Sequence, residues 1–250
     1  MWNTLIVRPL LNLMLLFYQI FGHETIVAVG LLTLLLRLIT TPLQLNQQKS
    51  ARKQQELRPK IEEIQKKYKD DKERLAQEQM SLYREAGISP LGGCLPSLIQ
   101  FPIMIGLYQA IIRALASTPL QLLELPKDIY SWIPGLSTLI PLKSQFLWMD
   151  LALPDQFYVL PIVVVATSWL YQKLLTPPAA DAQSAAMSKQ MMIMMPLMTG
   201  FFTATYASGL GVYFLISNLV GILQYYLFKG HFAPATPASP AKPEKAKAKS

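Results

Sequence analysis

A single arginine lies in the middle of an apolar stretch near the start of the chain. Arg37 is set into Leu31–Leu43, LLTLLLRLITTPL, and Thr40 and Thr41 follow it at helical spacing, so the three side chains share one helix face. A cation at the centre of a membrane helix costs about 2.5 to 3.5 kcal/mol on insertion scales, which makes Arg37 a functional-site hypothesis that fits attraction of a carboxylate. The alternative is that Arg37 snorkels to the headgroups from a helix end marked by Pro42.

The sequence contains none of the usual catalytic or nucleotide-binding motifs. We find no Walker loop, GxGxxG, HExxH or GxSxG pattern, and no pair of aspartates inside an apolar segment. The one cysteine, Cys94, excludes an internal disulfide and a cysteine-based zinc site, while His23 and His231 follow no ligand spacing. The apolar segments offer no nucleophile–base pair. The sequence therefore points away from an enzyme, a metal site or another cofactor, and towards handling of a polar or acidic substrate in the membrane.

The composition is that of a membrane protein. Of the 250 residues, 52% are hydrophobic and 15% are charged, and the mean hydropathy is +0.28. An ordinary soluble domain has about 25% charged residues. A membrane-spanning segment must satisfy its own backbone hydrogen bonds, and helices do so. We therefore predict an all-α polytopic membrane protein.

Apolar and charged segments alternate along the chain and predict its organisation. The predicted transmembrane helices are the first at 23–43, the second at 90–116, the third at 156–175, and the fourth and fifth within 189–228. The segments around them are an interfacial helix at 1–22, a charged helical hairpin at 44–89, a connection rich in proline and aromatic residues at 117–155, a polar loop at 176–188, and a disordered basic tail at 229–250.

The opening segment has a polar face. Thr4, Arg8, Asn12 and Gln19 fall on one side of a helix, which favours an amphipathic helix lying in the membrane interface. A signal peptide or a signal anchor is the alternative, although no small-residue cleavage motif is clear. If Leu5–Phe21 spanned the membrane, there would be six spans with the same core orientation.

The charged segment 44–89 predicts two helices that fold back on each other outside the bilayer. A narrow apolar seam supports the first helix, and its members are Leu57, Ile61, Ile64 and Tyr68. The pair Asp70–Asp71 can cap the second helix, and Gly87 is placed to end it. Pro59 is an awkward residue inside the first helix, which it can kink.

The distribution of basic residues predicts the orientation. Lysine and arginine crowd 44–89 and the tail, whereas 117–155 has only Lys127 and Lys143. The positive-inside rule places the hairpin, the 176–188 loop and the C-terminus in the cytoplasm, and the 117–155 connection and the N-terminus outside.

Several segments resemble one known family. Ile88–Tyr108, ISPLGGCLPSLIQFPIMIGLY, is similar to the opening of the second core helix in the YidC/Oxa1/Alb3 membrane protein insertase family. LLLRLITTPL, LRPKIEEIQKKY and SGLGVYFLISNLVGILQ also match, so the resemblance extends over Pro9–Lys229 in the right order. The short segment before the first core span and the short tail resemble the bacterial short form, and imply a multi-pass protein of the bacterial cell membrane.

The resemblance implies a five-helix core around a hydrophilic groove, open to the cytoplasm and to lipid, with Arg37 as the groove arginine. It also implies a chaperone-like insertase without nucleotide hydrolysis, whose partners are nascent membrane proteins and membrane lipids, and by extension the ribosome and the Sec translocon. The groove candidates are Arg37, Thr40, Gln100, Thr167, Ser168, Ser217 and Gln224. The candidates for a hydrophobic slide along which a substrate helix leaves are Tyr108, Met198, Tyr213 and Phe214.

Other functions remain open at this stage. A structural assembly factor for membrane complexes would carry the same features as an insertase. An anion transporter with Arg37 as its binding residue would predict repeated halves or broken helices, and the sequence shows no internal repeat. An enzyme ranks last, because the catalytic constellation is missing.

Overall fold

The computed structural model of the protein is mostly helical. The residues that it describes are 1–69, 71–87, 95–115, 123, 125–130, 133, 135–139, 142–176 and 182–227. The glycine-rich part of the family-like motif (Ile88–Cys94) and the predicted basic tail lie outside the described residues.

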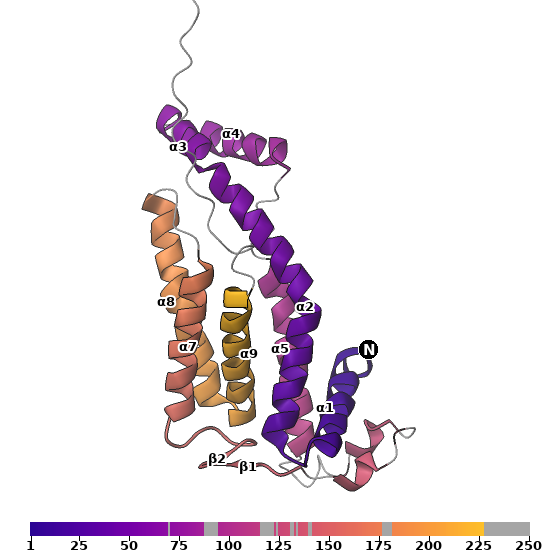
Figure 1. Ribbon diagram of the computed structural model, residues 1–250. Coiled ribbons are helices and arrows are strands. Elements are labelled where there is room, and N and C mark those ends of the chain that lie inside the picture. Colours follow the sequence, from indigo (N-terminus) through magenta and orange to yellow (C-terminus); the bar gives the residue numbers. More distant parts are fainter. Residues whose placement is uncertain are drawn as a thin grey trace, which may run out of the picture.

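The described helices account for every predicted apolar segment (Figure 1). They are η1 (Asn3–Val7), α1 (Arg8–Ile20), α2 (Thr25–Glu56), α3 (Arg58–Lys67), α4 (Lys72–Glu85), α5 (Leu95–Leu115), α7 (Val159–Leu175), α8 (Ala182–Thr205) and α9 (Ser208–Leu227). Between α5 and α7 lie the short turns η3 (Leu125–Lys127) and η4 (Leu136–Leu139) and the antiparallel strands β1 (Gln145–Phe146) and β2 (Met149–Asp150).

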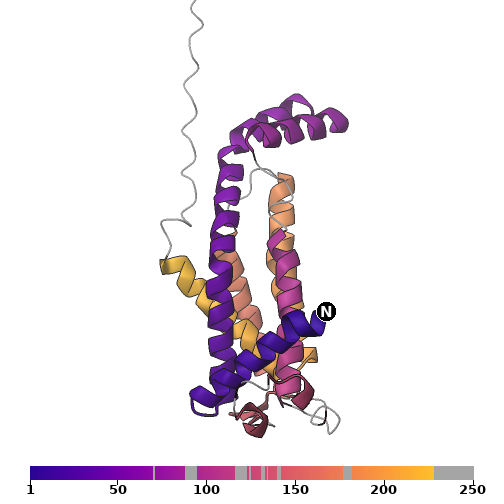
Figure 2. The same ribbon diagram turned by 90° about the vertical axis from the view of Figure 1, so that its right-hand side faces the viewer.

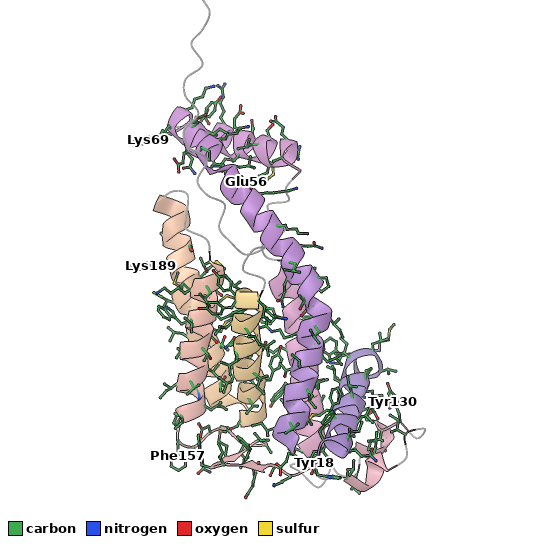
Figure 3. All side chains as sticks on the ribbon, viewed as in Figure 1. Tyr18, Glu56, Lys69, Tyr130, Phe157 and Lys189 are labelled. Atoms are coloured by element: carbon green, nitrogen blue, oxygen red, sulfur yellow. The ribbon has the colours of Figure 1, made fainter. Side chains whose placement is uncertain are left out.

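The long helices form a bundle with polar structures at its two ends. The α3–α4 pair lies across one end, beyond the tip of α8, and β1 and β2 lie at the opposite end (Figure 1). Helix α1 crosses the bundle obliquely near the β1–β2 end (Figure 2). Figure 3 places the charged residues Glu56 and Lys69 at the α3–α4 end, and Tyr18 and Phe157 at the other end.

Apolar side chains both fill the interior and cover the outside of the bundle. Leu11, Leu32 and Ile111 are fully buried where α1, α2, α5 and α9 meet. On the outside, Ile162 and Phe201 are 67% and 65% exposed. An apolar exterior is unfavourable in water and favourable in lipid, so this surface fits a membrane protein.

The lengths and apolar character of the described helices do not by themselves fix the number of membrane spans. Among the described residues, three helices are long and apolar enough to cross a membrane: Asn3–Ile20, Thr25–Asn46 and Ser208–Leu227. Phe101–Leu115 and Val159–Leu175 are shorter apolar helices. Helix α8 is not among them, and its first turns carry glutamine, serine and lysine. The count of five spans therefore remains a prediction.

Two helices extend beyond the predicted segment boundaries. Helix α2 passes through Pro42 and continues to Glu56, whereas we expected it to end at Leu43. The residues after Leu43 are mostly glutamine, lysine and arginine, which favour a helix, so nothing in the sequence stops it there. Helix α8 likewise begins at Ala182, inside the predicted loop 176–188.

Helix α4 begins and ends where the local sequence predicts, whereas α3 begins only at Arg58, so Pro59 does not lie in the interior of the first helix. The helical structure is interrupted at Leu57. Pro59 falls in the first turn of α3, where a proline is tolerated and does not kink the helix. The Asp71 carboxylate accepts a hydrogen bond from the Arg74 backbone N–H at 3.0 Å, which confirms the predicted cap of α4. Gly87 follows α4 with a φ of +65°, a conformation that favours glycine.

The polar face of the N-terminal helix meets protein. Asn12 is 2% exposed, and its side chain donates to the backbone carbonyl of Asp128 at 2.9 Å and accepts from the backbone N–H of Tyr130 at 2.8 Å. The Arg8 Nε donates to the Asp128 carboxylate at 2.8 Å. Because these partners belong to the connection between α5 and α7, the polar stripe that predicts an interfacial helix also docks α1 onto the bundle.

Asp128 joins three parts of the chain through one carboxylate. Arg8 from α1 approaches one oxygen, and Arg113 from α5 approaches the other at 2.6 Å. The Asn3 side chain donates to the Arg8-bound oxygen at 3.1 Å and accepts from Arg113. The Asp128 side chain is 11% exposed and each arginine 34%. Removing the carboxylate would leave two arginines unpaired, and removing the arginines would leave a mostly buried carboxylate unpaired. Either change costs free energy.

Replacing Asp128 should destabilise the protein measurably. We expect Asp128→Asn to lower the free energy of unfolding by about 1 to 3 kcal/mol, because two half-buried guanidinium groups lose their carboxylate. The measurement is reversible unfolding of the purified protein in mixed micelles, followed by circular dichroism.

Glu24→Gln is the matched control, because Glu24 pairs with Lys143 at 2.7 Å in an exposed ion pair. Hydrogen bonding to Glu24 raises the pKa of Lys143 above its usual range, so Lys143 stays protonated at neutral pH. Equal effects of Asp128→Asn and Glu24→Gln would contradict a structural role of the Asp128 network.

Candidate functional site

Arg37 is buried among side chains from three helices. It is 9% exposed, and its Nε donates to the Ser217 hydroxyl of α9 at 2.9 Å. Its Nη1 donates to the Tyr171 hydroxyl of α7 at 3.0 Å and lies 3.5 Å from the Gln44 Oε1. Helix α2 runs on far beyond Arg37, and the guanidinium turns into the protein, which does not fit the alternative of an arginine snorkelling from a helix end.

The threonines that follow Arg37 are satisfied by hydrogen bonds inside the bundle. The Thr40 hydroxyl donates to the Leu36 carbonyl at 2.9 Å, and the Thr41 hydroxyl donates to the Arg37 carbonyl at 2.6 Å. The Gln224 side chain donates to the Thr41 hydroxyl at 2.9 Å. Two predicted groove residues, Arg37 and Gln224, therefore lie one turn apart along the contact between α2 and α9.

A second set of polar contacts joins α9 to α7. The Asn218 side chain donates to the Ser168 hydroxyl at 2.8 Å and to the Thr167 hydroxyl at 3.3 Å. Asn218 and Ser168 are 8% and 9% exposed. Because Asn218 follows Ser217 directly, these contacts continue those of Arg37. We call the combined set the polar seam, and its members are Arg37, Thr41, Ser168, Tyr171, Ser217, Asn218 and Gln224.

The charge of Arg37 is not neutralised within the part of the chain that the structure describes. There, no carboxylate lies within ion-pairing distance of its guanidinium, and its partners are hydroxyl, amide and aromatic groups. Such groups solvate a cation and leave its net charge in place. The same described residues contain no group of three or more acidic, cysteine or histidine side chains that could hold a metal ion. The site is therefore suited to attracting an anion.

The remaining candidate residues differ in how far their side chains are exposed. Met198 on α8 is 41% exposed, and the half-buried Tyr108 on α5 packs edge to face against Tyr206 at 5.3 Å. Phe214 is half-buried beside Tyr213, but Tyr213 itself is only 3% exposed and belongs to the core. A side chain so enclosed does not face a passing substrate, so we no longer assign Tyr213 to the hydrophobic slide. The side chain of Gln100 lies outside the described residues.

Three residues of the polar seam were not among the predicted site residues: Thr41, Tyr171 and Asn218. Tyr171 follows Ser168 by three residues and Asn218 follows Ser217 by one. The helical spacing between Ser168 and Tyr171 was the available signal, since it puts both side chains on one face of α7. The spacing alone does not show that this face of α7 meets Arg37 of α2.

The fold and the polar seam together define a class of protein: a multi-pass helical membrane protein whose interior holds a buried arginine with no carboxylate partner among the described residues. The chain matches the family described as 60Kd inner membrane protein over residues 16–235, and it belongs to that family. The expected resemblance to the YidC/Oxa1/Alb3 family is thereby confirmed.

Relatives and a solved structure agree with this assignment. The chain is 36% identical to "Membrane protein insertase YidC" of Nitratidesulfovibrio vulgaris over 89% of its own length, but it spans only 38% of that protein. It is 34% identical to "Membrane protein insertase YidC 2" of Bacillus anthracis, covering 92% of this chain and 81% of that protein. "Membrane protein insertase MisCA" of Bacillus subtilis is 33% identical, with 92% and 79% covered.

Among solved structures, "Active YidC insertase crystal structure with the first transmembrane domain resolved" matches with a TM-score of 0.58 and 28% identity, covering 87% of this chain and 46% of that one. These names describe membrane insertases, which agrees with the expectation that the chain is not an enzyme. The relatives and the apolar helices together support a multi-pass protein of the bacterial inner membrane.

The link between α9 and α7 should depend on Asn218. We expect Asn218→Ala to lower the free energy of unfolding by about 0.6 to 1.7 kcal/mol, because the hydroxyls of Thr167 and Ser168 lose their interhelical donor. Reversible unfolding in mixed micelles measures the change.

Thr205→Val serves as the control, since the Thr205 hydroxyl donates only to the Phe201 carbonyl of its own helix. Finding Asn218→Ala no more destabilising than Thr205→Val would show that this part of the polar seam does not hold the two helices together.

Proposed function

We propose that this protein is a membrane protein insertase that receives polar or acidic segments of its substrates at Arg37. The observation that carries the proposal is the Arg37 guanidinium, which is buried in the bundle with no carboxylate partner in the described parts of the chain. The relatives of this chain are named membrane protein insertases. In this proposal the polar seam is the wall of a hydrophilic groove that opens towards the α3–α4 end.

The physical problem that the groove would solve is the crossing of charged segments. An acidic segment of a substrate that enters hydrocarbon unpaired costs several kcal/mol per charge. A groove with water and a cation partway across shortens the apolar path and offers the carboxylate a transient partner. The apolar helix of the substrate then moves into lipid, and burial of its surface supplies the driving force without nucleotide hydrolysis.

The orientation and partners follow from the same proposal. The basic α3–α4 pair and the C-terminus face the cytoplasm, where nascent membrane proteins arrive. The connection around Asp128 and the N-terminal helix close the outer end. The α3–α4 pair and the tail supply cationic groups that can bind ribosomal RNA phosphates, and the lipid-facing helices are where a Sec translocon would dock.

Insertion of an acidic segment should depend on the charge at position 37. We expect Arg37→Ala to reduce translocation of a short acidic N-terminal tail by about tenfold or more, and Arg37→Lys to retain most of it, because lysine keeps the cation. The measurement uses purified protein in liposomes with a single-span substrate, and scores protection of the tail from added protease.

A substrate whose tail aspartates are replaced by asparagines is the control, and its insertion should change little with Arg37→Ala. Insertion of the acidic tail that ignores both substitutions would reduce Arg37 to a structural residue. No insertion above empty liposomes would instead favour the assembly-factor function.

The hydrophobic slide should be detectable by cross-linking. A photoreactive residue at Met198 or Tyr108 should cross-link to the apolar helix of a stalled substrate, because these side chains lie on α8 and α5 beside the proposed exit. The same probe at Ile162, which is 67% exposed on α7, should react mainly with lipid. Equal substrate cross-linking from all three positions would contradict a defined exit path.

A further inference from the structure

We propose that Tyr171 is a positioning residue for Arg37, which it holds so that the Nη2 group of the guanidinium stays available to a substrate carboxylate. The inference rests on the proposed function of Arg37. Nothing in the resemblance or in the names of the relatives assigns a role to this tyrosine. The structure supplies two contacts and one glycine that support it.

Tyr171 binds the guanidinium in two ways at once. Its hydroxyl accepts a hydrogen bond from Arg37 Nη1 at 3.0 Å, and the Arg37 Cζ lies 5.2 Å from the centroid of the Tyr171 ring. The second contact is a cation–π interaction, which is strongest where water is excluded. Tyr171 thus restrains the planar group through both an edge and a face.

Gly221 of α9 has no side chain, and this leaves room for the Tyr171 ring beside Arg37. A Cβ atom at Gly221 would lie 2.5 Å from Cε2 and 2.7 Å from Cζ of the Tyr171 ring, and 3.1 Å from Arg37 Nη2. Both ring distances are below any normal contact, so a larger residue at position 221 would displace the aromatic ring. Gly221 lies four residues after Ser217, on the same face of α9 as the other partner of Arg37.

In these contacts, two nitrogens of the guanidinium donate to protein groups, and the third remains for a substrate. Nε donates to Ser217, and Nη1 donates to Tyr171 and approaches Gln44. For Nη2, no described residue provides an acceptor. The neutral ring and hydroxyl of Tyr171 hold the Arg37 side chain without cancelling its charge. A carboxylate partner would cancel it. Because the long arginine side chain is already ordered, less entropy is lost when a carboxylate binds to Nη2.

The first test compares substrates of different charge. We expect Tyr171→Leu to reduce insertion of the acidic-tail substrate by about threefold to tenfold, with Tyr171→Phe intermediate because it keeps the ring and loses the hydroxyl. Gly221→Ala should resemble Tyr171→Leu. Insertion of the asparagine-tail substrate should change little. The control is Tyr226→Phe, since Tyr226 on the same bundle is 59% exposed.

The second test reads the arginine directly and does not depend on insertion. In protein labelled with ¹⁵N-arginine, the Arg37 Nε–H signal is assigned by its loss in Arg37→Lys. We expect its hydrogen exchange with water to quicken by at least about threefold in Tyr171→Leu, and to stay unchanged in Tyr226→Phe. Unchanged exchange in Tyr171→Leu, or equal losses of insertion for both substrates, would overturn the inference. If Arg37→Ala leaves insertion intact, the proposed function fails, and the exchange measurement still decides whether Tyr171 orders Arg37.

Discussion

The burial of one guanidinium group is the constraint on which the arrangement of the core depends. A cation inside an apolar helix must be solvated, because burying it in hydrocarbon without polar partners costs several kcal/mol. Helices α7 and α9 provide that solvation through Tyr171 and Ser217, and neither residue neutralises the charge. Arg37 therefore accounts both for the packing of α2 against α7 and α9 and for the polar side chains in their shared interface.

The two ends of the bundle are built differently. At the end that carries β1 and β2, Asp128 collects Arg8 and Arg113, so that α1, α5 and the connection are joined by a neutralised network. At the level of Arg37 the positive charge has no carboxylate among the described residues. Fixed ion pairs suit a closed end, whereas an unneutralised cation suits a site that exchanges partners.

Local sequence patterns predicted the helices and the centre of the site, but not the contacts between distant segments. Arg37 could be found because an ionised residue in an apolar helix is costly, whereas Ser217 and Gln224 were groove candidates through the family resemblance. The role of Tyr171 depends on how α7 packs against α2, and no local period encodes that. The Asp128 network was missed for the same reason, since Asn3 and Arg8 lie more than 100 residues before Arg113 and Asp128. The predicted end of α2 at Leu43 was wrong because the helix-favouring residues after it continue the helix to Glu56.

In the proposed function, water reaches Arg37 from the α3–α4 end, and the labelling of single cysteines measures this access. In a Cys94→Ser background, Thr40→Cys lies on the polar face of α2, and Ile39→Cys, at the same depth, replaces a side chain that is 64% exposed on the outside. A membrane-impermeant maleimide added to vesicles with the α3–α4 end outward should label Thr40→Cys and leave Ile39→Cys unreacted. It should label neither from the opposite side. Equal labelling of the two positions, or no labelling of Thr40→Cys, would contradict a hydrated groove at Arg37.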